Sequence, residues 1–134
     1  MYYNLIQNDG NIAQILIDEQ LIEINQYEKC SHLQKLIIPS FVKEIEDNSF
    51  LECGSLIEIT IPSSVTMIGE NAFHGCKELE QIIISDSVVM IKSGAFKSCV
   101  SLKELIIPSG VKSIGSQAFY ECTSLKEIKL PPDI

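Results

Sequence analysis

Apolar positions recur along this chain at a fixed interval of 23 residues, from residue 30 to the end of the sequence. A shift by one interval brings Ile61 onto Ile84 and Cys76 onto Cys99. Self-similarity of this length predicts a solenoid, because one repeat alone cannot bury its apolar face and must pack against its neighbours. The pattern therefore predicts one stack of about five coils.

Each repeat begins with a short alternating stretch. Leu56 is followed by Ile59 and Ile61, and a single polar residue separates the last two. Period-two alternation predicts a strand, and Pro62 ends the strand because proline has no backbone N–H to donate. Strands one repeat apart are expected to lie in parallel, about 4.8 Å from each other. The sequence thus predicts a parallel β-sheet along one face of the solenoid.

The second half of each repeat predicts a corner. Ala72, Phe73, Cys76 and Leu79 lie at positions i, i+1, i+4 and i+7, which is the spacing of roughly one and a half helical turns. We expect each coil to consist of a strand, a tight bend, a side segment and a short helix or 3-10 turn. The solenoid as a whole then contains little helix.

Residues 1–29 depart from the repeat and are predicted to form an N-terminal cap. Apolar runs at residues 3–6 and 12–17 flank an Asn-Asp-Gly-Asn stretch at residues 8–11, which is a strong signal for a hairpin turn. An irregular first repeat follows the hairpin. A cap of this kind covers a sheet edge that otherwise recruits other chains. We therefore divide the chain into this cap and the repeats of residues 30–134, which end partway through a coil.

The repeat resembles the BspA-like (Treponema pallidum-type) family of leucine-rich repeats. Residues 56–76, LIEITIPSSVTMIGENAFHGC, match the family pattern LxxIxIPxxVxxIGxxAFxxC at every signature position. The chain departs from the pattern at Ser85, which replaces a proline, and at Glu46 and Lys92, which replace a glycine. The resemblance implies a right-handed leucine-rich-repeat solenoid. It also implies, commonly, a surface antigen or adhesive protein that binds other macromolecules.

The location of the protein has two interpretations. The family resemblance implies the cell surface. The first 16 residues show no signal peptide, which favours a cytoplasmic scaffold or regulatory repeat domain as the alternative. No apolar run approaches 18 residues, so no membrane insertion is expected.

The charge of the chain narrows the class of partner. The formal net charge is −8, and all 10 basic residues are lysine. Without arginine the chain lacks the planar fork that recognises phosphate and guanine, so nucleic-acid binding is not expected. Residues 1–67 contain most of the excess acid. This acidic half either steers a basic partner or is an ordinary solvated surface.

No motif points to catalysis, a metal or a cofactor. The chain contains neither a Gly-x-Ser-x-Gly elbow nor a Gly-rich phosphate loop. His32 and His74 occupy different positions of the repeat, and the five cysteines form no CxxC pair for zinc. We predict that the cysteines are buried free thiols, because side chains that point the same way disfavour disulfides. The chain is therefore predicted not to be an enzyme.

The candidate binding site is the outward side of the predicted sheet, on the concave face of the solenoid. Alternation places Leu36 and Ile38 in the core. The outward positions of the five repeats are Lys35, Ile37, Glu58, Thr60, Gln81, Ile83, Glu104, Ile106, Glu127 and Lys129. Their isoleucines form a stripe bordered by charge. This stripe is either a recognition surface or a set of β-branched residues that stabilise neighbouring strands.

The resulting hypothesis is a protein–protein interaction or adhesion module. Its partner is a protein or an extracellular-matrix macromolecule, bound through the concave face. The open edge of the last strand, at residues 128–130, carries a second hypothesis, which is self-association with another copy of the chain.

Overall fold

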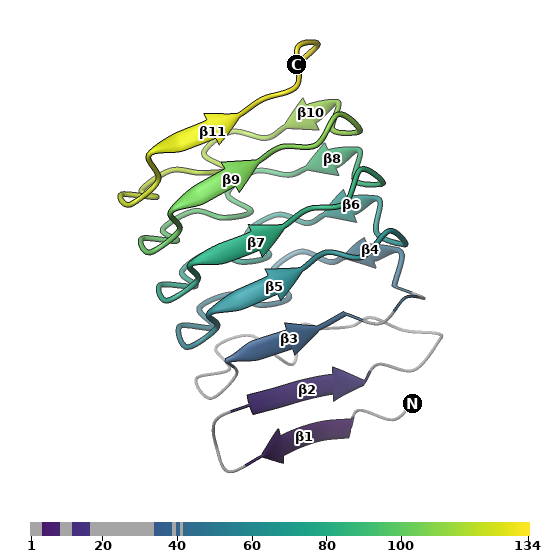
Figure 1. The fold of residues 1–134 in the computed structure, drawn as a ribbon, viewed down its shortest axis with the longest axis vertical. Helices are drawn as coiled ribbons and strands as arrows, with labels where there is room; N and C mark the ends of the chain where they lie inside the picture. The colour runs from purple at the N-terminus through teal and green to yellow at the C-terminus, as the bar shows by residue number, and fades with distance from the viewer. Residues whose placement is uncertain (1–3, 9–11, 17–33, 39, 41) are drawn as a thin grey trace.

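Stacked coils make up the molecule, and each coil contributes one strand to a front face and one to a back face (Figure 1). The structure is a computed structural model and describes residues 4–8, 12–16, 34–38, 40 and 42–134. The front face, nearest the viewer in Figure 1, contains β3 (Lys35–Ile37), β5 (Glu58–Thr60), β7 (Gln81–Ile83), β9 (Glu104–Ile106) and β11 (Glu127–Lys129). The back face contains β4 (Glu44–Ile45), β6 (Met67–Ile68), β8 (Met90–Ile91) and β10 (Ser113–Ile114).

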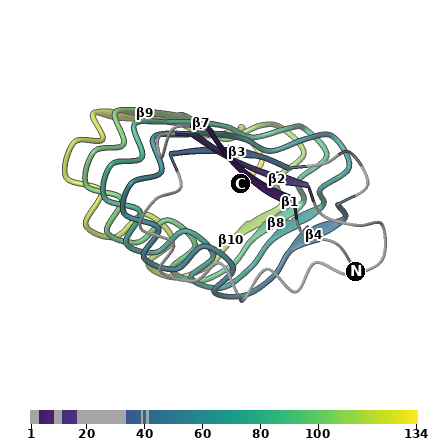
Figure 2. The ribbon, with the colours of Figure 1, turned by 90° about the horizontal axis from the view of Figure 1, so that it is seen from below.

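The strands of each face pair in parallel and follow the interval of the sequence repeat. On the front face, Leu36 lies opposite Ile59, and Ile59 lies opposite Ile82. In the last pair, Leu105 lies opposite Ile128. Viewed along the stack, the coils lie over one another (Figure 2). The predicted solenoid with a parallel sheet along one face is confirmed.

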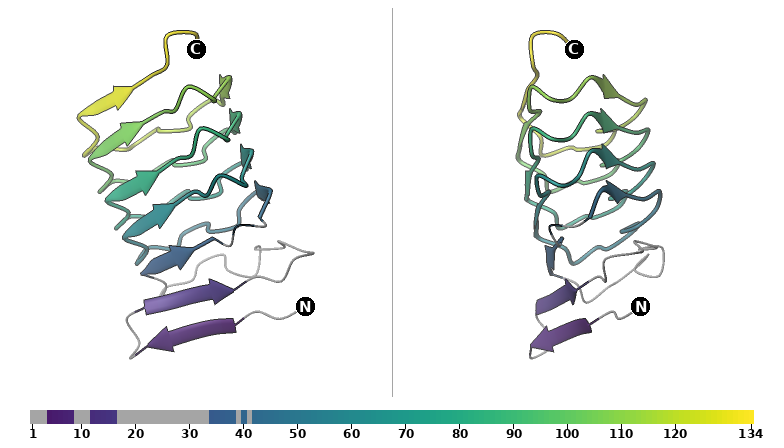
Figure 3. Two further views of the ribbon diagram at one scale, coloured as in Figure 1. Left: turned by 45° about the vertical axis from the view of Figure 1, so that its right-hand side comes forward. Right: turned by 90° about the vertical axis from the view of Figure 1, so that its right-hand side faces the viewer.

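A two-stranded hairpin precedes the stack. Strands β1 (Asn4–Asn8) and β2 (Ile12–Leu16) pair antiparallel, and β2 lies beside β3 at the start of the front face (Figures 1 and 3). The two apolar runs predicted to form a hairpin do so. The division into a cap at residues 1–29 and repeats at residues 30–134 stays a prediction. The irregular first repeat lies outside the described residues.

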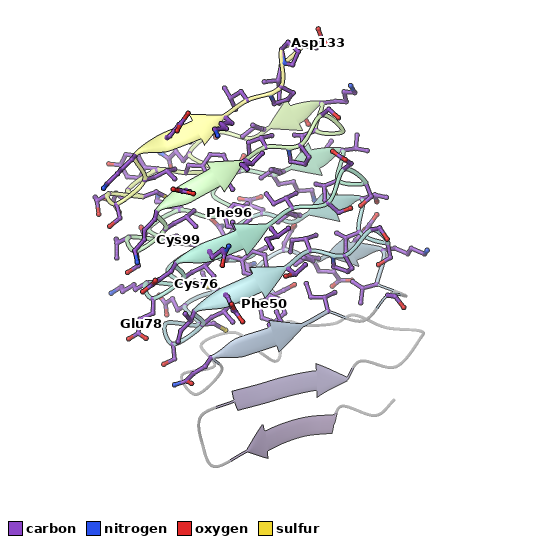
Figure 4. All side chains as sticks on the ribbon, in the orientation of Figure 1. Phe50, Cys76, Glu78, Phe96, Cys99 and Asp133 are labelled. Carbon is purple, nitrogen blue, oxygen red and sulfur yellow. The ribbon has the colours of Figure 1, made fainter. Side chains whose placement is uncertain are left out.

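Phenylalanine and cysteine columns fill the corner between the two faces. Ring centroids in the column Phe50, Phe73, Phe96 and Phe119 are 5.3, 5.3 and 5.7 Å apart, with interplanar angles of 12°, 2° and 5°. Each stacked pair adds about 0.5–1.5 kcal/mol to the free energy gained from burial. Beside the rings, the Cys76 thiol donates to the Phe50 carbonyl at 3.3 Å, and the Cys99 thiol donates to the Phe73 carbonyl at 3.2 Å. Figure 4 labels four of these side chains, Phe50, Cys76, Phe96 and Cys99.

The corner, predicted to contain a short helix or a 3-10 turn, is a series of turns, and the solenoid contains little helix as predicted. The described residues contain no helix. Along the corner, successive backbone N–H groups donate in turn to a carbonyl of the same coil and to a carbonyl of the next coil. The His74 N–H donates to the Asn71 carbonyl three residues back, at 3.1 Å, and the Phe73 N–H donates to the Ala95 carbonyl of the next coil, at 2.8 Å. A helix needs bonds to the carbonyl four residues back, and here every second N–H is used to join coils.

Left-handed backbone conformations explain why the corner is not helical. Two columns, four residues apart, have positive φ throughout. The first contains Asn48 (61°), Asn71 (52°), Gly94 (64°) and Gln117 (56°), and the second contains Glu52 (58°), Gly75 (76°), Ser98 (59°) and Glu121 (60°). This conformation costs a residue with a Cβ roughly 1–2 kcal/mol and ends any right-handed helix. The contacts between coils outweigh that cost.

A further column contains Gly69 and Gly115, and Lys92 departs from the family pattern in the same column. A Cβ on Gly69 would lie 2.5 Å from the Asp47 backbone nitrogen, and a Cβ on Gly115 would meet the backbone of the preceding coil at 2.2 Å. Lys92 occupies the same position in the coil between them. Its Nζ reaches the Asp47 carboxylate at 3.3 Å, and the Glu70 N–H donates to the same carboxylate at 2.7 Å. The lysine therefore links two coils that are not adjacent.

Replacing Gln117 by glycine is expected to stabilise the protein. Glycine adopts φ of 56° without strain, and this relief exceeds the entropy that glycine loses on folding. We expect the free energy of unfolding to rise by about 0.5–1 kcal/mol in urea titrations. The control is Ser116→Gly, one residue earlier, which we expect to lower it by about 0.5–1 kcal/mol. Equal destabilisation by both substitutions would contradict this account of the corner.

Candidate functional site

The front-face strands present alternate side chains to solvent, as the sequence predicts. Ile59, Ile82 and Leu105 are buried. The exposed positions are Glu58, Thr60, Gln81, Ile83, Glu104, Ile106, Glu127 and Lys129. The side chains of Lys35 and Ile37 lie outside the described part, although the backbone of β3 pairs with β5. The fold thus gathers the described candidates on one face, and their role in binding stays a prediction.

The ladder of strand pairs on this face is interrupted between β7 and β9. The described front-face strands pair as β3–β5–β7 and β9–β11, whereas the back-face strands β4, β6, β8 and β10 pair without a break. One coil earlier, the Ile61 N–H donates to the Ile83 carbonyl at 2.7 Å. Among the described residues, no equivalent bond joins Ile84 to Ile106. The coils are therefore joined less tightly here on the front face than on the back.

A groove of about 590 Å³ lies over this interruption. Its lining consists of Ile57, Glu58, Glu80, Gln81, Ile82, Ile83, Ile84, Lys103, Glu104, Leu105 and Ile106. Ile83 and Ile106 are 54% and 64% exposed, which is unusual for two isoleucines on adjacent strands. Ile82 and Ile84 are 6% and 8% exposed, compared with 2% and 1% at the same positions one coil earlier. The volume lies within the range of binding pockets for small ligands or single side chains.

The charges around the groove are mainly acidic. Glu58, Glu80 and Glu104 line it, together with one cation, Lys103. The Lys103 Nζ lies 2.7 Å from Glu80 Oε2, so this ion pair joins the segments that lead into β7 and β9. Both side chains are more than half exposed, and such a pair adds little stability. The groove therefore combines exposed aliphatic surface with an excess of carboxylates.

Sequence reasoning missed three groove residues that lie just before the strands: Ile57, Glu80 and Lys103. Strict alternation counted back from Ile59 places residue 57 in the core. The chain turns at that point, and Ile57 is 39% exposed. A signal was available, because Glu80, Lys103 and Lys126 occupy the same column of the repeat as Ile57. Three charged residues in one column indicate a solvent-exposed position.

The cysteine column carries free thiols rather than a reactive site. Cys53, Cys76, Cys99 and Cys122 are free, as predicted, and Cys30 lies outside the described residues. Burial raises the pKa of the Cys76 thiol well above its ordinary value, and the neighbouring thiols of Cys99 and Cys53 raise it further. Burial also raises the pKa of Cys99, and that of the half-buried Cys122. A raised pKa removes the thiolate that nucleophilic or metal-binding chemistry needs.

The described part of the chain offers neither a metal site nor a membrane-spanning helix. In that part, no three His, Cys, Asp or Glu side chains lie together in a way that would hold a metal. None of its segments forms a helix with the length and apolar character needed to cross a bilayer. Ile128, Leu130 and Ile134 are 37%, 56% and 43% exposed around the last strand. Self-association through this edge stays a prediction.

The repeats match a known family of sequences. The family described as BspA type leucine-rich repeat region matches residues 2–126 in six copies. A search of curated proteins found no relative.

Solved structures with the same fold come from several bacteria. A leucine-rich repeat protein from Bacteroides ovatus is 32% identical, with a TM-score of 0.79 over 97% of this chain and 39% of its own. One from Bacteroides capillosus is 25% identical, with a TM-score of 0.68 over 95% of this chain and 92% of its own. The pneumococcal vaccine antigen PcpA is 27% identical, with a TM-score of 0.61 over 72% of this chain and 30% of its own. The chain therefore spans well under half the length of the first of these proteins.

Alkylation is expected to follow the burial of the thiols. In the folded protein at pH 8, iodoacetamide should modify Cys122 before Cys76 and Cys99, because Cys122 is less buried and the thiolate is the reactive form. The order is read by mass spectrometry of digested protein. In denaturant without reductant, the five cysteines of the sequence should all be modified. Modification of Cys76 in the folded protein as fast as Cys122 would show that the coils do not protect the thiols.

Proposed function

The chain belongs to the BspA type leucine-rich repeat family, and on this premise we propose that it is a non-enzymatic module that binds a macromolecular partner through its front face. The observation that carries the proposal is the groove between β7 and β9, with two exposed isoleucines bordered by carboxylates. Exposed apolar surface with a polar border is the usual composition of a protein-binding site. Solenoids of stacked repeats offer extended surfaces for this purpose.

The front face exposes two isoleucines, Ile83 and Ile106, on neighbouring strands. Cross-strand packing of β-branched residues stabilises a sheet where the strands are paired. Ile83 lies opposite Thr60 on β5, and Ile106 lies opposite Lys129 on β11, so neither isoleucine lies opposite another apolar residue in a paired ladder. Recognition of a partner accounts for both residues.

We further propose that the module acts at the cell surface. The support is that one structural neighbour is a pneumococcal vaccine antigen. A partner of this module is then another protein or an extracellular-matrix macromolecule.

Substitution of the front-face isoleucines tests the binding proposal. We expect Ile83→Ser combined with Ile106→Ser to lower the affinity for a partner isolated with the wild-type protein by about tenfold or more, because each buried isoleucine contributes about 1.5–3 kcal/mol. The measurement is surface plasmon resonance. The unfolding temperature should change little, because both side chains are exposed.

The matched control has the same kind of change on the back face. Val89 and Met90 are 46% and 42% exposed, so Val89→Ser with Met90→Ser removes a similar amount of apolar surface. This control is expected to keep wild-type affinity. The front-face proposal is wrong if the front-face variant binds the partner as tightly as the wild type does. It is also wrong if the back-face control loses as much affinity as the front-face variant.

Labelling of intact cells tests the location. Cells that produce the protein are treated with a biotin reagent that reacts with amines and does not cross membranes. A surface protein is expected to be labelled on its exposed lysines, such as Lys43 and Lys112, to a similar extent before and after lysis. Labelling only after lysis would establish the alternative, an intracellular scaffold or regulatory domain.

A further inference from the structure

The groove on the front face lies where the stack departs from its own regularity. The sequence repeat continues through β7 and β9 without insertion, yet these strands do not pair and their neighbours do. The back-face ladder keeps the two coils in register behind the interruption. The groove therefore lies at an irregular point of the described front face, between β7 and β9, and extends to Ile57 and Glu58 of the coil before.

The apolar part of the groove fits an aliphatic side chain. Its apolar lining is mainly isoleucine and leucine and includes no aromatic residue. Ile83 and Ile106 project beside it, while Ile82 and Leu105 lie beneath them and are buried. A branched aliphatic group placed here covers exposed hydrocarbon without displacing the core.

The border of the groove fits a cation. Of its charged groups, Glu80 is already paired with Lys103. Glu104 is exposed on β9 beside Ile106, and the described residues place no ion-pair partner within reach of it. Three carboxylates and one lysine line the groove, so its local charge favours a cationic segment. Complementarity therefore favours a partner with positive charge next to an aliphatic residue.

We propose that this groove binds a segment of the partner protein in which an aliphatic side chain is flanked by lysine or arginine. The aliphatic side chain covers Ile83 and Ile106, and a flanking cation lies against the Glu104 carboxylate. This proposal rests on the proposed function of the front face and names the chemistry of the partner. It assigns the recognition to one pair of coils rather than to the whole sheet.

Three fluorescein-labelled pentapeptides test the proposal with the full chain. The probe Lys-Ile-Lys-Ile-Lys contains both features, Lys-Ser-Lys-Ser-Lys lacks the aliphatic side chains, and Glu-Ile-Glu-Ile-Glu reverses the charge. Fluorescence anisotropy at low and moderate salt measures their binding. We expect the first peptide to bind at least about tenfold more tightly than either of the others. The second peptide lacks the apolar contact, and the third lacks the attraction between its charges and the carboxylates. Its affinity should fall as salt is added.

Matched substitutions test whether the first peptide binds at the groove. Glu104→Lys removes the negative charge and Ile106→Ser removes the apolar contact. Each substitution is expected to weaken the affinity for the first peptide by about fivefold or more. Glu44→Lys and Met90→Ser make the same changes on the exposed back face and should leave its affinity within about twofold. Equal loss from the front-face and back-face substitutions would overturn the proposal. Equal binding of the first two peptides would also overturn it, because general charge attraction then accounts for the binding.

The remaining outcomes separate this proposal from the function on which it rests. If no peptide binds, but the front-face variant with Ile83→Ser and Ile106→Ser still loses the partner, the chemistry proposed for the groove is wrong and the binding face stands. If that variant keeps the partner, the proposed function itself is wrong. Light scattering compares the oligomeric state of the wild-type protein with that of the Ile106→Ser variant. A dimer that dissociates on this substitution would show that a second copy occupies the groove, and would overturn the proposal.

Discussion

Each coil of this protein depends on its neighbours to bury its phenylalanine and cysteine side chains. The rings lie 5.3 to 5.7 Å apart in a nearly parallel column, and each described thiol from Cys76 onward donates to a phenylalanine carbonyl one coil back. No coil contains both partners of any of these contacts. The interior is therefore built from contacts between coils, and stability must spread along the stack from one coil to the next. Phe119 and Cys122 are only partly buried, and each of them contacts the coil before its own.

Much of the fold could be predicted from the sequence, because burial in a stack requires an apolar residue at the same position of every coil. The front-face strands and their register follow directly from the columns that contain Leu56, Ile59 and Ile61. The corner could not be predicted in the same way. Apolar spacing there is compatible with a helix, and only the backbone conformation rules the helix out. Residues in that left-handed conformation include Asn71 and Ser98 as well as glycine, so their identities carry little signal.

The sequence predicts which front-face residues point outward, but it does not predict the groove between β7 and β9. Alternation along the strands is sufficient to place Ile83 and Ile106 outside, because inward positions are occupied by core residues. The interruption between β7 and β9 has no comparable signal, since residues 81–84 and 104–107 have nearly the same apolar pattern. One departure from the repeat does lie at this place. Ser85 follows β7, where prolines follow β5, β9 and β11.

If the proposed function holds, the front face recognises a partner while the back face joins the coils. Behind the groove, the back-face ladder is continuous. The Lys92 side chain also spans one intervening coil to reach Asp47. The β8–β10 pair joins the two coils where the front face is less regular, so the groove does not require a gap in the core. Residues that serve the fold and residues available to a partner alternate along the same strand, as Leu105 and Ile106 do. The outward residues are consequently free to vary among repeats without loss of the fold, and a difference among them at one pair of coils is sufficient to create a distinct site.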